Sequence, residues 1–167
     1  MDRIEAFEPI FGENPKILIL GSMPSVKSLE NMEYYGHGRN QFWRIMGDLF
    51  GFDRYDDYDL RKRMIIENNI ALWDVIASCE RKGSLDRDIK NAKYNDIIGF
   101  IKDNPSIDKI VLNGGKAGGI YRKQFAAYLP HLESFVLYST SPANAIPYER
   151  KYEQWKTIKD WGINDGL

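Results

Sequence analysis

Short apolar runs that end in small or polar residues recur along the chain. They are KILILG (residues 16–21), NIALWDVI (69–76), DKIVLNG (108–114) and SFVLYS (134–139). A run of this length that is largely apolar, without regular alternation, is typical of a strand buried on both faces of a parallel sheet. The pattern therefore predicts a sheet of four parallel strands.

Between these runs, and after the last one, apolar residues recur with the spacing of amphipathic helices. The predicted helices cover residues 41–50, 57–68, 94–101, 115–129 and 148–161. Strands that alternate with helices in this way form parallel sheets with helices on both faces. We therefore expect an α/β fold, a three-layer α/β/α sandwich with a central four-stranded parallel sheet, in which residues 1–167 form a single domain.

Composition narrows the class of protein. The chain has 167 residues, of which 43% are hydrophobic and 28% charged, and its net charge is −1, so no overall basic character indicates a nucleic-acid partner. Cys79 is the single cysteine, and His37 and His131 are the only histidines, which argues against a disulfide, an iron–sulfur cluster or a zinc site. No stretch has the character of a secretory signal or is apolar for long enough to cross a membrane. We expect a soluble, cytoplasmic protein without a metal.

The four predicted strands end in GSMPS, WDVIAS, LNGG and STSPAN, all rich in small or polar residues. In open parallel sheets, ligands bind outside the carboxyl ends of the strands. The fold prediction alone therefore locates a binding site at these four segments.

Each segment taken alone is a weak signal. GSMPS (residues 21–25) combines a glycine that allows close backbone approach with a proline that stiffens the turn. STSPAN (139–144) could grip phosphates through hydroxyl and amide groups, although a serine-rich turn is also common. NGGKAGG (113–119) lacks the spacing of a phosphate-binding loop, so we interpret it as a strand-to-helix turn.

The stretch YYGHGRNQFW (34–43) carries more chemistry. Tyr34 and Tyr35 offer stacking faces, Arg39 offers a cation, and Asn40 offers an amide directly before a predicted helix. This combination suits a planar base next to a sugar-phosphate. For Asn40, the alternative interpretation is a cap at the start of the 41–50 helix.

Taken in order, GSMP, YYGHGRNQFW, LWDV, GSLD, LNG and STSPAN resemble the uracil-DNA glycosylase superfamily, and most closely its hypoxanthine (deoxyinosine) branch. The resemblance extends from about Lys16 to Trp155, and its specificity lies in the order and spacing of the segments. It implies a monofunctional glycosylase without a cofactor. It also implies a monomer whose partner is double-stranded DNA containing a deaminated or mismatched base.

The resemblance also implies roles for individual residues. Met23 stands where many members of the superfamily have a water-positioning aspartate or asparagine, and a thioether cannot take that role. The catalytic residue is then expected to be Asn40. The expected base-binding residues are Gly21, Ser22, Met23, Pro24, Tyr35, Phe42, Asp74 and Asn113, with Tyr34 as an alternative to Tyr35. The expected DNA-binding residues are Ser25, Arg39, Ser139, Thr140, Ser141, Pro142, Ala143 and Asn144.

Three alternatives remain open at the level of sequence. The first is a glycosylase that acts on uracil or thymine in mismatches, although STSP replaces the His-Pro-Ser-Pro of the main uracil enzymes and favours another base. The second is a non-catalytic module that binds damaged DNA, which retention of Asn40 argues against. The third is a binder of free nucleotides, which the missing phosphate-loop spacing argues against.

Overall fold

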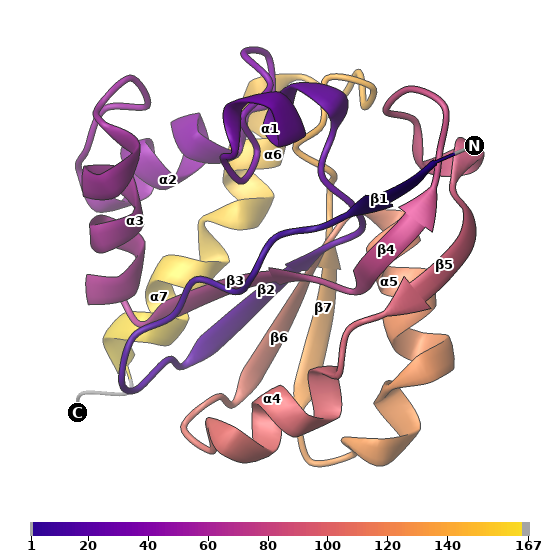
Figure 1. Cartoon of the computed structure of the whole chain (residues 1–167). Coiled ribbons are helices and arrows are strands. Elements are labelled where there is room, and N and C mark those ends of the chain that lie inside the picture. Colours follow the sequence, from indigo (N-terminus) through magenta and orange to yellow (C-terminus); the bar gives the residue numbers. More distant parts are fainter. Residues whose placement is uncertain (1, 165–167) are drawn as a thin grey trace.

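The computed structural model describes residues 2–164, with side chains described through residue 161. Figure 1 shows a twisted central sheet with helices packed on its faces. The strands are β1 (Arg3–Glu5), β2 (Ile17–Gly21), β3 (Ile70–Asp74), β4 (Ile76–Glu80), β5 (Lys90–Tyr94), β6 (Lys109–Asn113) and β7 (Glu133–Leu137). The helices are α1 (Val26–Asn31), α2 (Phe42–Phe50), α3 (Tyr58–Glu67), α4 (Ile97–Asp103), α5 (Gly115–Gln124), α6 (Tyr148–Trp155) and α7 (Thr157–Asn164), with short 3₁₀ turns η1 (Asp86–Asp88) and η2 (Ala126–Tyr128).

The predicted parallel sheet is confirmed. Its strand order is β3-β2-β6-β7, and every neighbouring pair is parallel. In this register Gly21 lies opposite Asp74, and the carbonyl oxygen of Gly21 accepts a hydrogen bond from the backbone N–H of Val75 at 2.9 Å. The first two predicted strands therefore end side by side, near the centre of the view in Figure 1.

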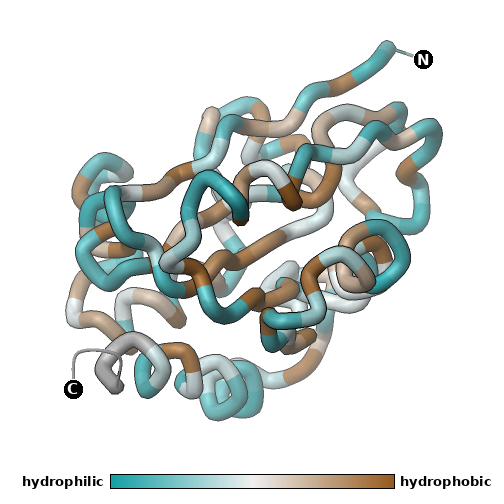
Figure 2. The backbone as a smooth tube through the Cα atoms, turned by 90° about the horizontal axis from the view of Figure 1, so that it is seen from below, coloured by the Kyte–Doolittle hydropathy of each residue, from teal (hydrophilic) through white to brown (hydrophobic). Residues whose placement is uncertain are grey.

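Alternate residues of β2 build the two apolar layers of the sandwich. Leu18 and Leu20 pack in one cluster with residues of α4 and α5, whereas Ile17 and Ile19 pack in another with residues of α2, α3, α6 and α7. All four side chains are at most 1% exposed, because both faces of the strand are covered. Figure 2 shows hydrophobic positions running through the centre of the fold, with hydrophilic positions on the outer turns.

A second sheet was not predicted. Strands β1, β4 and β5 form a three-stranded antiparallel sheet, and β4 begins at Ile76, only two residues after β3 ends. The predicted strand 69–76 is thus two strands in two sheets.

The predicted helix 94–101 is also wrong at its start. Tyr94 belongs to β5, and α4 begins at Ile97 because the Asp96 side chain caps it by accepting from the backbone N–H of Gly99.

Two further helix predictions need correction, and one helix was missed. The predicted helix 115–129 ends at Gln124 and is followed by η2, with Phe125 between them turned into the core. The predicted helix 148–161 is two helices separated at Lys156, where the hydroxyl of Thr157 donates to the carbonyl of Gln154 at 3.1 Å. Helix α1 was not predicted at all.

Within residues 2–164, no helix has the length and apolar character needed to cross a membrane.

Candidate functional site

A cavity of about 400 Å³ opens at the carboxyl edge of the parallel sheet. The loops after β2, β4 and β7 form its wall together with the segment before α2, and these loops gather at the top of Figure 1. Most of the residues expected at the site line this cavity. They are Gly21, Ser22, Met23, Pro24, Ser25, Tyr35, Asn40, Asp74, Asn113, Ser139, Thr140, Ser141, Ala143 and Asn144.

Three expected residues do not line it. Phe42 is fully buried and packs on the ring of Tyr35, with the ring centroids 4.2 Å apart. Its place is behind the cavity wall, where it supports Tyr35. Arg39 is exposed outside the cavity, and Pro142 belongs to the β7 loop without forming part of the wall.

Tyr34, expected as an alternative to Tyr35, also lines the cavity. The structure adds wall residues that sequence reasoning did not assign: Ser28, Ser84, Leu85 and Asp86. The last three belong to the loop between β4 and β5, and the GSLD segment was the available signal for them. The Ser84 hydroxyl accepts from the N–H of Val26 at 2.9 Å, and Asp86 accepts from the hydroxyl of Ser22 at 2.7 Å. The loop after β4 is thereby fixed to the loop after β2.

Asp74 lies at the buried end of the cavity. Its side chain is 3% exposed, and its Oδ2 atom has no hydrogen-bond partner among the described residues. Burial raises the pKa of the Asp74 carboxyl to about 7, and the negative charge of Asp86 adds to the shift. At neutral pH this carboxyl is therefore present in both its ionised and its protonated form.

Glycine is required beside this carboxyl. A Cβ atom placed on Gly21 would lie 2.6 Å from Asp74 Oδ1 and 3.0 Å from the Tyr35 hydroxyl. The hydroxyl of Tyr35 is also buried and has no hydrogen-bond partner in the described part of the chain. Two oxygens with unused hydrogen-bonding capacity therefore flank the end of β2.

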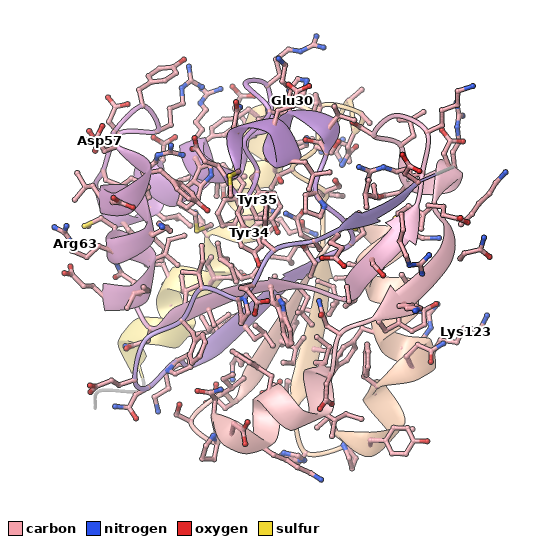
Figure 3. The ribbon with its side chains drawn as sticks, in the orientation of Figure 1. Glu30, Tyr34, Tyr35, Asp57, Arg63 and Lys123 are labelled. Carbon is pink, nitrogen blue, oxygen red and sulfur yellow. The ribbon has the colours of Figure 1, made fainter. Side chains whose placement is uncertain are left out.

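The two tyrosines of the opening loop have different environments, and Figure 3 labels both between α1 and the sheet. Tyr34 is 3% exposed and its hydroxyl donates to the carbonyl of Glu8 at 2.8 Å. Its own carbonyl accepts from the indole N–H of Trp43 at 2.6 Å, so both ends of the residue are held. Tyr35 has a backbone φ of 53°, in the left-handed region, which is uncommon for a bulky residue. That backbone conformation carries its ring onto Phe42.

Asn40 lines the cavity immediately before α2. Its Oδ1 atom accepts from the N–H of Phe42 at 2.9 Å, and its backbone N–H donates to the carbonyl of His37 at 2.9 Å. The N-cap residue of α2 is Gln41, whose side chain makes no capping hydrogen bond, so Asn40 closes a turn one residue before the cap position and is not the expected cap itself. An amide oxygen has two lone pairs, so the hydrogen bond from Phe42 fixes the side chain and leaves further hydrogen-bonding capacity.

Asn113 and the loop after β7 form a closed hydrogen-bonded unit. Asn113 Nδ2 donates to Thr140 Oγ1 and Asn113 Oδ1 accepts from the Thr140 N–H, both at 3.0 Å. Beneath the same loop, the ammonium group of Lys151 donates to the carbonyls of Ser141 and Asn144 at 3.4 and 3.0 Å. Lys151 is 1% exposed, and burial lowers the pKa of its ammonium group. These contacts hold the loop in one conformation.

Ser25 also has a structural contact. Its hydroxyl accepts from the N–H of Ser28 at 3.1 Å and caps α1. Among the described residues, no group of three or more histidine, cysteine, aspartate or glutamate side chains could hold a metal ion.

A parallel α/β sheet with a cavity lined by polar residues at its carboxyl edge is typical of proteins that bind a small ligand at the strand ends. Residues 9–161 match the profile of the Uracil DNA glycosylase superfamily, and the chain belongs to this family.

Individual relatives cover nearly the whole chain. A hypoxanthine DNA glycosylase of Methanosarcina barkeri is 36% identical over 152 residues, which are 90% of this chain and 94% of the relative. A hypoxanthine DNA glycosylase of Methanosarcina acetivorans is 35% identical over 158 residues, covering 91% and 95%. A solution NMR structure from Methanosarcina acetivorans, provisionally described as a uracil DNA glycosylase, has a TM-score of 0.83 at 31% identity and covers 96% of this chain and 99% of its own.

Proposed function

We propose that the protein is a monofunctional DNA glycosylase that flips a deaminated base out of double-stranded DNA and hydrolyses its N-glycosidic bond. The proposed base is the hypoxanthine of deoxyinosine, as named for two relatives at 36% and 35% identity. The observation that carries the proposal is one cavity lined by Asn40, Tyr35 and Asp74, whose Oδ2 atom has no hydrogen-bond partner among the described residues. A carboxyl group so placed can accept a hydrogen bond from a bound base.

Asp74 is the group proposed to read the base. Hypoxanthine carries a donor at N1–H, whereas adenine has a lone pair at N1. An ionised carboxylate accepts a hydrogen bond from N1–H of hypoxanthine and is repelled by the N1 lone pair of adenine. With adenine in the cavity the buried carboxylate would stay unpaired, which costs about 1–3 kcal/mol. The pKa of about 7 means that this form is populated at neutral pH and grows as the pH rises.

Tyr35 is proposed to stack on the flipped base. Phe42 covers one face of its ring, so the base would use the other. Flipping costs a few kcal/mol, and stacking on an aromatic ring returns on the order of 1–3 kcal/mol per base. Mispaired inosine unstacks more readily than a normal base, which contributes to selectivity.

Asn40 is proposed to hold the attacking water under C1′ of the sugar. The hydrogen bond from Phe42 fixes the amide, and the second lone pair of Oδ1 is suited to accept from water. Cleavage passes through an oxocarbenium-like sugar, as in other glycoside hydrolysis. Backbone amides of Ser22 and Met23, with Asn113 nearby, would stabilise the charge that develops on the leaving base.

The DNA backbone is proposed to lie along Ser25, Arg39 and the loop of residues 139–144. Hydroxyl and amide groups bind phosphates without long charged side chains, and such contacts position a duplex without reading its sequence. The hydrogen bonds of Asn113 and Lys151 to this loop support the proposal, because a preformed loop loses less entropy when it binds.

The test is single-turnover cleavage of duplexes that contain inosine, uracil or thymine in a mismatch, followed by alkali to reveal abasic sites. We expect cleavage of inosine DNA without added metal or nucleotide. Preferential cleavage of uracil would favour the alternative that the description of the NMR relative suggests. Binding to all three duplexes without any cleavage would favour a damaged-DNA-binding module.

Substitutions of Asn40 separate the water-holding role from the turn that its side chain closes before α2. Asn40→Ala should cleave inosine DNA at least ~100-fold more slowly and lose ~0.5–1.5 kcal/mol of stability, the scale of one hydrogen bond. Asn40→Ser should keep the turn and most of the stability, since a serine hydroxyl can also accept from the backbone N–H two residues on, but lose cleavage because its hydroxyl is too short to reach the water. A folded Asn40→Ser protein that cleaves at a near-normal rate would contradict the catalytic role.

A further inference from the structure

Lys151 has the most deeply buried charged side chain in the described part of the chain. It lies on α6 and is 1% exposed, and its ammonium group donates to the carbonyls of Ser141 and Asn144. Buried lysines are normally paired with a carboxylate, because an unpaired charge is costly to remove from water. Lys151 forms no salt bridge with another described residue. The fold therefore buries a positive charge beneath the 139–144 loop without supplying its negative partner.

Neutral hydrogen bonds already hold this loop. Asn113 binds Thr140 through both ends of its amide, and the Thr140 carbonyl accepts from the N–H of Gln41 at 3.0 Å. Within the loop, Asn144 Nδ2 donates to the carbonyl of Ser139 at 3.1 Å. None of these contacts needs a charged group. A buried ammonium is a costly way to add two more, so its charge is expected to act on something outside the loop.

The peptide unit between Asn144 and Ala145 connects the buried charge to the surface. Its carbonyl accepts from Lys151 at 3.0 Å, and a trans peptide bond directs its C=O and N–H groups to opposite sides. The N–H of Ala145 therefore points away from the ammonium group. Ala145 is exposed, and this N–H has no hydrogen-bond partner among the described residues. A cation on the carbonyl also polarises the unit, which makes the N–H a stronger donor.

A phosphate of the DNA backbone fits both features. Its oxygens accept hydrogen bonds from backbone N–H groups, and it brings the negative charge that Lys151 lacks. The side chains of residues 139–144 carry no charge of their own. A buried charge is screened by salt much less than an exposed one, so Lys151 can act across the thickness of the loop.

We propose that Lys151 positions DNA without touching it, by turning the N–H of Ala145 outward and supplying the positive charge that a DNA phosphate neutralises at this loop. The inference rests on the proposed function and adds to it a charge that acts from beneath the binding surface. The same charge is costly in the free protein and favourable in the complex, where the phosphate becomes its negative partner.

The test measures binding to a duplex that carries a tetrahydrofuran abasic-site analogue, which has no glycosidic bond to cleave. Lys151→Met removes the charge and the donors, whereas Lys151→Gln keeps a neutral donor. Both variants should bind at least roughly tenfold more weakly, because both lack the charge. Both should also reduce the slope of log affinity against log salt concentration by about 1, as expected for one phosphate neutralised less.

The matched control is Lys156→Met. Lys156 lies at the carboxyl end of α6, is exposed, and is paired with Glu153 at 2.9 Å. Its replacement removes the same formal charge from the chain and should leave both affinity and slope unchanged. Full recovery of affinity and slope in Lys151→Gln would overturn the proposal, because a neutral donor would then suffice.

Stability separates this role from simple support of the loop. Lys151→Met should melt at or above the temperature of the wild-type protein, because an apolar side chain of similar length replaces an unpaired buried charge. A Lys151→Met protein that melts lower while its salt slope is unchanged would show that the lysine only supports the loop, and would overturn the proposal.

Selective ¹⁵N labelling of alanine gives a local readout. The N–H resonance of Ala145 should move downfield when the wild-type protein binds the analogue duplex, and should move much less in Lys151→Met. Ala127 in η2 is the control and should not respond in either protein. A wild-type complex without a shift at Ala145 would overturn the contact. A protein that shows these binding signatures but cleaves no inosine DNA would retain this inference and reject the glycosylase instead.

Discussion

Asn113 and Asp74 occupy equivalent places and differ in what their side chains bind. Each ends a strand that pairs with β2, each is buried, at 9% and 3% exposure, and each lines the cavity. Both heteroatoms of the Asn113 amide are engaged by Thr140, whereas Asp74 Oδ2 has no partner in the described chain. At this edge of the sheet, the Asn113 side is completed, because its polar atoms are hydrogen-bonded within the protein. The Asp74 side is open, because its Oδ2 atom remains able to bond a ligand.

This difference has an energetic meaning. A buried polar group without a partner costs about 1–3 kcal/mol, and a protein retains such a group where the group serves another purpose. The hydroxyl of Tyr35, which lies near Gly21 as Asp74 does, is also buried and has no hydrogen-bond partner among the described residues. Substitutions on the two sides should therefore have opposite effects on stability.

The largest expected effect is on how stability depends on pH at Asp74. The carboxyl ionises near pH 3.8 when unfolded and near pH 7 when folded, so the folded protein holds a proton over that interval. The wild-type protein should therefore lose stability as the pH rises from about 4 to about 7, by on the order of 4 kcal/mol from this group. Asp74→Asn cannot ionise and should lack that part of the loss.

Denaturant unfolding of both proteins at several pH values measures the difference. The free energy of unfolding of Asp74→Asn should exceed that of the wild-type protein more and more as the pH approaches 8. Parallel profiles for the two proteins would mean that Asp74 is ionised throughout and paired with a group that the structure does not show.

The second effect concerns the space beside Asp74. Gly21→Ala should displace the carboxyl or the Tyr35 hydroxyl, because its Cβ would come within 2.6 and 3.0 Å of them. Small displacements in a site can cost about 100-fold in rate, and we expect a loss of inosine cleavage of that order. Gly119→Ala is the control, since its Cβ would meet nothing within 4 Å. That helical substitution should raise stability by about 0.5–1 kcal/mol and leave cleavage unchanged.

The two sheets differ in how well the sequence predicted their strands. Apolar runs predicted the parallel strands within a few residues, because a strand buried on both faces needs an unbroken run. The antiparallel sheet was missed since β4 continues directly from β3 and β5 has mostly exposed residues, so neither gives a separate apolar pattern.

At the site, the positions of residues could be predicted from the sequence, but their hydrogen bonds could not. Asp74 and Asn113 could be placed at the cavity because parallel strands end at one edge. Their hydrogen-bonding states depend on Thr140, which is 27 residues from Asn113, and on burial by many elements. No local pattern records such contacts, and the place of Leu85 in the cavity wall depends likewise on hydrogen bonds between its loop and the loop after β2.

The third effect is on the completed side of the edge. Thr140→Val keeps the shape of the side chain but removes the hydroxyl that accepts from Asn113 Nδ2. The amide is then left without that partner at a buried site, and we expect a loss of about 1–3 kcal/mol in the free energy of unfolding. Cleavage measured well below the melting temperature should fall less than in Gly21→Ala. An unchanged stability would show that the amide finds another partner and that the contrast with Asp74 is smaller than the structure indicates.

The smallest effect has the opposite sign. Tyr35→Phe removes a buried hydroxyl that has no partner within the described residues, so it should raise the free energy of unfolding by about 1 kcal/mol. Tyr121→Phe is a matched control, because the Tyr121 hydroxyl is also buried and without a partner among those residues, but Tyr121 does not line the cavity. Both variants should be stabilised to a similar extent, and only Tyr35→Phe should slow the cleavage of inosine DNA. If Tyr35→Phe is stabilised and cleaves normally, its hydroxyl does not contact the base, and the open side of the edge consists of Asp74 alone.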